Sequence, residues 1–302
     1  MKKTIIIVIV IIALIAVYFI GRGSSKPEPV VTNETPSTIT TPVTPATTTK
    51  PVISVDKTKT VIGTSVEGRD IMAYHYGTGS KELLFVGGIH GGYSWNTALL
   101  AYQLNDYLKT NPTIVSSQLK VTVIPVLNPD GLNMVVGTTT GNFTAKDVVS
   151  SKLTQGRFNA NDVDLNRNFD CDWKSSAVWQ NKPVSGGDTA FSEPESEAVK
   201  TYINKNLPAV VVIFYSAAGG VYASNCHDGV TAGTETLMKT YAKASGYPAF
   251  KSYDYYATTG DMANWLAKNS IPAISVLLTD HTNTEYTKNV AGVKALLEHY
   301  SK

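Results

Sequence analysis

The stretch Val163-Asp164-Leu165-Asn166-Arg167-Asn168-Phe169 places a carboxylate, two amides and a guanidinium within seven residues. It forms a polar cluster with Asn166 and Arg167 side by side. The cluster lies in a region where strand patterns alternate with helix patterns. In α/β folds the functional side chains lie on loops that leave the carboxyl ends of strands. The cluster therefore predicts a site on one of these loops.

The region around this cluster alternates between two patterns. Apolar runs over residues 82–88, 120–127, 209–215 and 273–278 predict buried strands. Helical patterns cover residues 97–109, 193–206, 233–245, 261–269 and 289–300. The alternation predicts an α/β fold with a mostly parallel or mixed twisted sheet, flanked by helices.

Further polar or glycine-rich motifs follow the predicted strands. The first strand ends in Gly87-Gly88-Ile89-His90-Gly91-Gly92, and the second ends in the tight-turn sequence Asn128-Pro129-Asp130-Gly131. Arg157 precedes the polar cluster. Downstream, Tyr256 is followed by Gly260, Asn264 and Trp265.

These motifs, together with Phe191-Ser192-Glu193-Pro194-Glu195, occur in the order of a known family. From Gly68 to the C-terminus the chain resembles the zinc metallocarboxypeptidases of the carboxypeptidase A superfamily. The resemblance implies a parent activity, the hydrolytic removal of a C-terminal residue from a peptide, including a cell-wall peptide. In that family His, Glu and His hold zinc and leave one position for water. A separate glutamate takes a proton from this water.

The resemblance assigns roles to six residues of this chain. They are His90 as the first zinc ligand, Asp164 as the carboxylate that orients it, Arg157 as the oxyanion arginine, Asn166 and Arg167 as the pair that binds the substrate's terminal carboxylate, and Tyr256 as the tyrosine that closes over the bound end.

Three other essential residues of the family are replaced. The zinc glutamate belongs at Tyr93, or at Ser94 in relatives with a longer turn. Tyr215 stands at the second zinc histidine, and Leu277 stands at the catalytic glutamate.

These replacements predict that zinc is absent or weakly bound and that the chain does not hydrolyse peptides. One neutral imidazole is too few ligands, because protein zinc sites use three or four. Free tyrosine ionises only near pH ~10. The pattern fits a natural pseudoenzyme and a deliberately inactivated enzyme equally. Two alternatives are an active zinc carboxypeptidase with non-standard ligands and a non-catalytic stalked surface module.

Several further residues carry weaker predictions. The pairs His227-Asp228 and Asp280-His281 resemble metal ligands, but such pairs are usually solvated loop residues. Ile274 and Thr259 hint at a neutral pocket for the terminal side chain.

The two cysteines predict one disulfide. Cys171 follows the polar cluster and Cys226 follows the strand that ends at Tyr215, so both are expected at the rim of the site. Outside the cytosol such cysteines are usually paired. Two cysteines are too few for a disulfide scaffold or a four-thiolate zinc site.

The N-terminal part of the chain is different in character. Residues 1–22, with Lys2 and Lys3 before an apolar run, predict a membrane anchor or a signal segment. Residues 23–55 are rich in Pro, Thr and Ser and predict a disordered linker. Residues 56–302 form the carboxypeptidase-like domain. This organisation predicts a membrane-anchored, extracytoplasmic protein, or a secreted one if the first segment is cleaved.

The composition limits the partners. The chain is 43% hydrophobic and 17% charged, with a formal net charge of +2. These values exclude wholesale disorder, and no basic stripe suggests nucleic-acid binding. The predicted partners are the C-terminus of a peptide and, through the N-terminal segment, a membrane.

Overall fold

The computed structural model describes residues 58–302. The predicted anchor (1–22) and linker (23–55) lie outside the described residues. Within residues 58–302, no helix is both long enough and apolar enough to cross a membrane.

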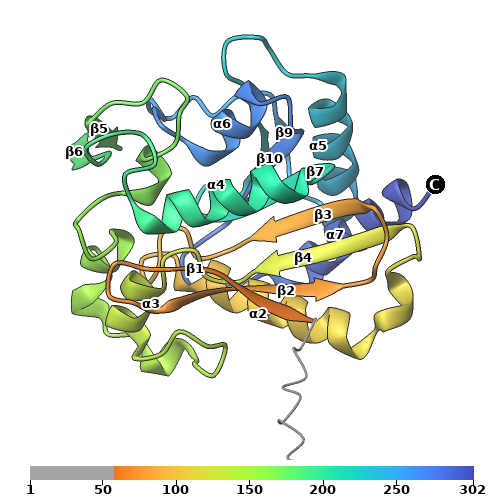
Figure 1. Cartoon of the computed structure of the whole chain (residues 1–302), viewed down its shortest axis with the longest axis horizontal. Helices are drawn as coiled ribbons and strands as arrows, with labels where there is room; N and C mark the ends of the chain where they lie inside the picture. Colours follow the sequence, from red (N-terminus) through yellow and green to blue (C-terminus); the bar gives the residue numbers. More distant parts are fainter. Residues whose placement is uncertain (1–57) are drawn as a thin grey trace, which may run out of the picture. The chain divides into compact units, whose positions relative to one another are not determined.

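A mixed eight-stranded sheet forms the centre of this region, in the order β1-β2-β4-β3-β7-β10-β8-β9 (Figure 1). Its strands are β1 (Lys59–Thr64), β2 (Asp70–Tyr76), β3 (Lys81–Val86), β4 (Leu119–Ile124), β7 (Val210–Ser216), β8 (Gly220–Ala223), β9 (Ala249–Phe250) and β10 (Ala273–Leu278). The four strands β4, β3, β7 and β10 run parallel, whereas β1, β2 and β8 pair antiparallel with their inner neighbours. The predicted mixed, mostly parallel sheet is confirmed.

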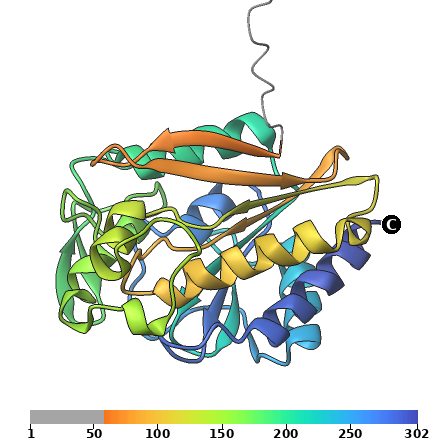
Figure 2. The same cartoon turned by 90° about the horizontal axis from the view of Figure 1, so that it is seen from below.

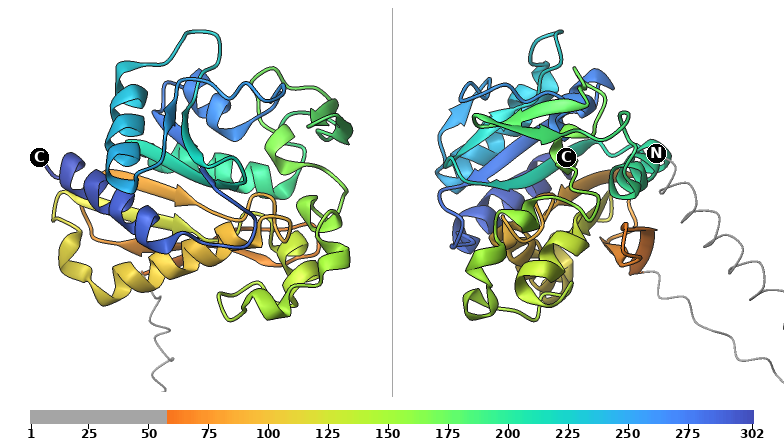
Figure 3. Two further views of the ribbon diagram at one scale, coloured as in Figure 1. Left: turned by 180° about the vertical axis from the view of Figure 1, so that it is seen from behind. Right: turned by 90° about the vertical axis from the view of Figure 1, so that its left-hand side faces the viewer.

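Helices cover both faces of the sheet (Figures 2 and 3). One face carries α2 (Trp95–Thr110), α5 (Ala232–Ser245) and α7 (Tyr286–Tyr300), and the other carries α4 (Pro194–Asn206) and α6 (Met262–Lys268). Alternate side chains of β3 divide between the two cores: Leu83 and Phe85 face the first group of helices, and Leu84 and Val86 face the second. Burial on both faces explains why these strands are continuous apolar runs.

The remaining elements are short and lie around the loops. They are α3 (Pro129–Val136), the hairpin β5 (Ser176–Trp179) and β6 (Lys182–Ser185), and the 3-10 turns η1 (Pro112–Ile114), η2 (Ala145–Asp147), η3 (Ser150–Lys152), η4 (Gln155–Arg157) and η5 (Leu165–Arg167).

The loop after β3 positions the first histidine of the predicted site. The predicted strand over residues 82–88 ends earlier, at Val86, because the chain turns away at Gly87. A Cβ atom at Gly87 would lie 2.7 Å from the carbonyl oxygen of Pro125, and Gly88 has a positive φ of 60°. Only glycine fits this close approach without strain. The turn then directs His90 into the loops at the carboxyl edge of the sheet.

Candidate functional site

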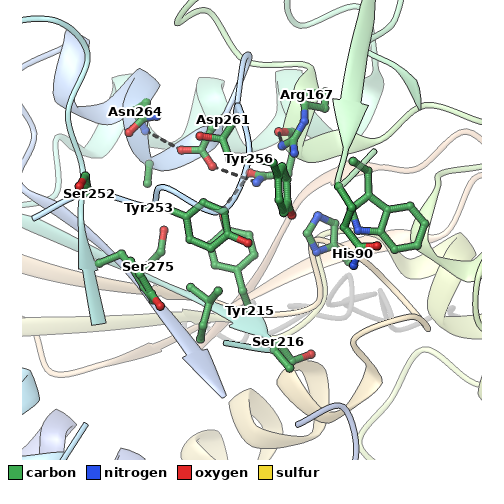
Figure 4. Close-up of a pocket in the computed structure, with 18 of the residues that line it drawn as sticks. His90, Arg167, Tyr215, Ser216, Ser252, Tyr253, Tyr256, Asp261, Asn264 and Ser275 are labelled. Atoms are coloured by element: carbon green, nitrogen blue, oxygen red, sulfur yellow. Dashed lines mark hydrogen bonds between the residues drawn. The ribbon is translucent and has the colours of Figure 1, made fainter. Parts of the chain in front are cut away.

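A pocket of about 230 Å³ lies at the carboxyl ends of the parallel strands (Figure 4). Eight of the ten residues assigned to the site from the sequence line it: His90, Tyr93, Arg157, Asn166, Arg167, Tyr215, Tyr256 and Leu277. Asp164 and Ser94 are fully buried behind them. The pocket has two parts. We call His90, Tyr93, Ser94, Tyr215 and Leu277 the metal half, and Asn166, Arg167, Tyr256 and Asp261 the carboxylate half.

His90 is a buried, neutral imidazole. Both of its ring nitrogens are buried and neither has a hydrogen-bond partner among the described residues. Its Nε2 lies 3.5 Å from Asp164 Oδ1, which is longer than a normal hydrogen bond. Burial, with the nearby Arg157 guanidinium, lowers the pKa of His90 to about 4. The ring therefore offers lone-pair nitrogen at neutral pH.

Asp164 is bound mainly to Arg157 rather than to His90. Arg157 donates from Nε at 2.9 Å and from Nη2 at 2.8 Å, both to Asp164 Oδ2. Burial opposes ionisation of Asp164, but the Arg157 guanidinium outweighs it and holds the pKa of the carboxyl well below its usual range. Arg157 also lies over the Trp179 ring, 4.3 Å from its centroid. This arginine is thus fixed in place with its charge balanced.

The Tyr215 ring lies beside His90, 5.6 Å between ring centroids, and its hydroxyl reaches into the carboxylate half. Its hydroxyl donates to Asn166 Oδ1 at 2.9 Å. Burial, together with the nearby Asp261 carboxylate, raises the pKa of Tyr215 well above its usual value. The phenol is therefore a neutral donor. Leu277 is the register partner of Tyr215 across β7 and β10, and it presents only an apolar side chain to the pocket.

The two candidate positions for the missing zinc glutamate have different surroundings. The Tyr93 ring packs against Trp179 at 4.9 Å and His281 at 4.6 Å between ring centroids. Ser94 is the N-cap residue of α2, but its side chain makes no cap hydrogen bond. Its buried hydroxyl has no partner among the described residues. The unpartnered hydroxyl favours position 94 as the one able to take a polar group.

The residues present do not fit a zinc ion. Within the described part of the chain, one group of three His, Cys, Asp or Glu side chains has donor atoms close enough for a metal, namely Cys171, Cys226 and His227. It lies outside the lining of the pocket, and its two sulfur atoms form a disulfide. The metal half supplies one imidazole, neutral hydroxyls and a leucine, whereas zinc sites need three or four anionic or imidazole ligands.

The carboxylate half is highly ordered by hydrogen bonds. Asn166 donates from Nδ2 to Asp261 Oδ2 at 2.9 Å, and its Oδ1 accepts from the Met262 backbone at 3.2 Å. Arg167 donates to the carbonyls of Val178 at 3.0 Å and Asn166 at 2.6 Å.

Arg167 forms no direct ion pair among the described residues, although its charge acts on the nearby Asp261 carboxylate. No carboxylate among residues 58–302 lies within ion-pair distance of its guanidinium, unlike that of Arg157. The Tyr256 ring lies nearby, with its centroid 5.9 Å from the guanidinium carbon. A buried, oriented and unpaired guanidinium is well suited to bind a carboxylate from outside.

His281, which the sequence offered only as half of a possible metal pair with Asp280, lines the pocket. Asn96 donates from Nδ2 to the carbonyls of Asp280 and Asn283, so its Oδ1 accepts from the Ser216 hydroxyl at 3.1 Å. Since the single hydroxyl proton of Ser216 is used there, the 2.9 Å contact between Ser216 and His281 Nδ1 places a proton on Nδ1. The Nε2 of His281 then carries a lone pair.

The two predicted metal pairs do not act as pairs. Asp280 accepts hydrogen bonds from Thr282 and Asn283 in its own turn, while His281 faces the pocket. His227 pairs with Asp172 at 2.9 Å on the surface.

The predicted disulfide between Cys171 and Cys226 is confirmed. The carbonyl of Cys171 accepts from Gly260 at 2.7 Å, so the bridge also supports the loop that carries Tyr256 and Asp261.

The hint of a neutral specificity pocket is not supported. Ile274 belongs to the core beneath α5 and α7, because its side chain points to the opposite face of β10 from the pocket. Thr259 does not line the pocket either. This part of the pocket is lined instead by Ser275, Asn264, Thr258 and Asp261. Asp261 was missed because the sequence Gly260-Asp261-Met262 reads as an ordinary helix start.

Comparison with known proteins identifies relatives of this chain. A sequence profile described as zinc carboxypeptidase matches residues 56–291. The chain is 25% identical over 243 residues to gamma-D-glutamyl-L-diamino acid endopeptidase 1 of Lysinibacillus sphaericus, covering 74% of this chain and 60% of the relative. The chain thus spans less than two thirds of that relative's length.

Two solved structures share the fold. The murein-tripeptide amidase of Escherichia coli O157 superposes with a TM-score of 0.55 at 21% identity, over 79% of this chain and 91% of that one. Carboxypeptidase A of Helicoverpa armigera gives a TM-score of 0.61 at 18% identity, over 81% of this chain and 67% of that one.

Proposed function

The chain belongs to the zinc carboxypeptidase family, and we propose that its domain binds the free C-terminus of a peptide without cleaving it. The parent activity of the family is removal of the C-terminal residue. In this chain the carboxylate half keeps the groups that would hold a peptide's terminal carboxylate. The metal half lacks the groups that would cut the peptide.

One observation carries this proposal: the Tyr215 hydroxyl donates to Asn166. A residue at the position of a zinc ligand is thereby used to order the carboxylate half. Its raised pKa keeps it protonated, and a protonated phenol is a poor zinc ligand. With Leu277 in place of a proton acceptor, no side chain at these positions can activate water.

The peptide we propose is a cell-wall peptide. The supporting observations are the relatives, since one is named for a gamma-D-glutamyl-L-diamino acid bond and another for a murein tripeptide. We further propose that residues 1–22 hold the domain at the outer side of a membrane, as an anchor or before cleavage as a signal. The disulfide is consistent with an oxidising compartment.

The direct test uses a peptide and its C-terminal amide with the full chain. We expect measurable affinity for the free acid, markedly weaker binding of the amide, and no released amino acid after prolonged incubation with added zinc. Affinity equal for acid and amide would contradict the proposal. The stalked-module alternative predicts that neither peptide binds.

A second candidate function is supported by His281. His281 and His90 place two imidazole rings on the lining of one pocket. His281 offers the lone pair of its Nε2, and neither ring nitrogen of His90 has a hydrogen-bond partner among the described residues. An active enzyme with non-standard ligands would use them. Metal analysis of the purified full chain after dialysis against zinc separates the two candidates. We expect far less than one equivalent of zinc per chain, and a stoichiometric content would favour the active enzyme.

A further inference from the structure

His281 uses only one of its two ring nitrogens within the protein. Its Nδ1 lies 2.9 Å from the Ser216 hydroxyl. Its Nε2 has no hydrogen-bond partner among the described residues and, unlike the two nitrogens of His90, is accessible to solvent. Because the ring lines the pocket, Nε2 is open to a ligand that enters there.

The groups that fix the protonation of this ring cannot turn. Asn96 is fully buried, and its amide donates to the backbone carbonyls of Asp280 at 2.8 Å and Asn283 at 3.0 Å. The amide oxygen is therefore left to accept the proton of Ser216. Since Ser216 has no second proton to give, Nδ1 of His281 must be the donor of the pair. Nε2 is held as the acceptor nitrogen.

The ring is also held in position and kept neutral. The Tyr93 ring packs against it with 4.6 Å between the ring centroids. Burial, together with the nearby Arg157 guanidinium, lowers the pKa of His281, and this outweighs the opposite effect of Asp280. At neutral pH the pocket therefore contains a fixed imidazole whose exposed nitrogen accepts a hydrogen bond.

The metal half offers few other acceptors to a ligand. Leu277 is apolar, and both nitrogens of His90 are buried. The Tyr215 hydroxyl is already bonded to Asn166, and the Ser216 hydroxyl already makes two hydrogen bonds. A donor group that leaves water for this part of the pocket needs a new acceptor, because an unpaired buried donor is costly. Nε2 of His281 is in a position to supply it.

A bound peptide brings such donors. If Arg167 binds the terminal carboxylate, the main chain continues across the pocket at about 3.5 Å per residue. Each peptide bond of this segment carries an N–H group that loses its water on binding.

We propose that Nε2 of His281 accepts a hydrogen bond from a backbone N–H of the bound peptide, at the last or the preceding peptide bond. The pocket then favours ligands with a secondary amide at that bond over esters and over residues without an N–H, such as proline. This inference rests on the proposed function, because it assumes that Arg167 binds the terminal carboxylate.

The test measures binding of three ligands to the full chain in the presence of a chelator. The ligands are acetyl-trialanine and two analogues in which lactate replaces the last or the middle alanine. Each replacement turns one backbone N–H into an ester oxygen and keeps the methyl side chains and the free carboxylate. We expect at least one analogue to bind about 5-fold more weakly than the peptide, because one neutral hydrogen bond is lost.

Two variants of His281 separate its two nitrogens. His281→Asn keeps a donor for Ser216 but has no atom at the position of Nε2, so the peptide and the analogue should bind within about 2-fold of each other. His281→Gln places an amide group further from the backbone and should keep more of the preference than His281→Asn. His299→Asn is the matched control, since His299 is exposed on α7 and does not line the pocket. It should leave the preference unchanged.

The outcomes distinguish this inference from the proposed function. Equal affinity for the peptide and both analogues, with the C-terminal amide still weak, would overturn the role of His281 alone. A preference that persists in His281→Asn would also overturn it, because another group would then be the acceptor. No binding of any acid would overturn both proposals.

Discussion

The two halves of the pocket differ in how many of their buried polar atoms have hydrogen-bond partners. In the carboxylate half, Asn166 and Arg167 are fixed by hydrogen bonds from and to neighbouring residues. In the metal half, the two nitrogens of His90 and the hydroxyl of Ser94 are buried without partners among the described residues. Buried polar groups without partners are unfavourable and usually mark a missing water, ion or side chain. This contrast is what we expect of a pocket that binds a peptide C-terminus without cleaving it, as we propose.

The strongest test of this contrast restores the metal half. We expect Tyr215→His with Leu277→Glu and Ser94→Glu to bind about one zinc per chain and to release C-terminal residues at least about 10⁴-fold faster than the unaltered chain. His90 and the loops already stand in place, so three side chains supply two ligands and a base. Zinc content and product release are the measurements.

Single restorations serve as the control for that experiment. Because residues that act as a unit are strongly non-additive, each single variant should gain almost nothing. If the triple variant with Tyr93→Glu in place of Ser94→Glu binds zinc and the Ser94 version does not, position 93 held the glutamate. If neither binds zinc, the assignment of the metal half is wrong.

The next largest effect concerns the carboxylate half. Arg167→Ala should weaken binding of a peptide acid by about 10- to 100-fold, because a hydrogen-bonded charge is removed from a desolvated site. Binding of the peptide amide should change little. Titration of both peptides measures this, and Arg69→Ala, at a distant arginine that pairs with Asp130, is the matched control. An equal loss for acid and amide would contradict a role in carboxylate recognition.

We expect His90, in the metal half, to make the free energy of unfolding depend on pH. The pKa of His90 is about 4 in the folded chain, against ~6.5 for free histidine, so the unfolded chain binds more protons between these values. Stability should therefore fall as the pH falls from about 6.5 to 4, by on the order of 2 kcal/mol from this residue. Urea unfolding in the presence of a chelator measures it. His90→Gln should reduce the slope, and an unchanged slope would show that the imidazole is not held neutral.

The smallest effect tests the bond that connects the two halves. Tyr215→Phe removes the hydroxyl that donates to Asn166 Oδ1. The oxygen still accepts a hydrogen bond from the Met262 backbone N–H in this variant. We expect a loss of about 1 kcal/mol in unfolding free energy and less than about 3-fold in affinity for a peptide acid. A larger loss of affinity would mean that the Met262 backbone alone cannot hold Asn166 in place once the phenol hydroxyl is removed.

The sequence predicted the sheet and most of the lining of this pocket. The continuous apolar runs of β3, β7 and β10 reflect burial on both faces, and the motifs around His90 and Arg167 follow strands that end at one edge. Such features depend on local pattern and on topology. They can therefore be read without coordinates.

Three features of the site could not be predicted in the same way. The bond between Tyr215 and Asn166 joins residues far apart in sequence, and only the packed structure determines that the phenol turns toward the amide. Asp261 reads as a helix cap, and only the packed structure shows that it also accepts a hydrogen bond from Asn166. Likewise, the protonation of His281 follows from a chain of hydrogen bonds through Asn96 and Ser216.

The order of strands in the sheet also affects how the chain acquires its structure. Leu83 on β3 pairs with Val210 on β7, so the middle of the sheet joins two segments from different halves of the chain. While the polypeptide is being made, β1 to β4 can associate first, and β3 then exposes an apolar, unpaired edge until β7 is available. Pairing between such distant segments is slow to form, and an open strand edge invites association with other chains. The central position of β7 therefore leaves the first half of the domain with an exposed apolar edge until residues 210–216 have been made.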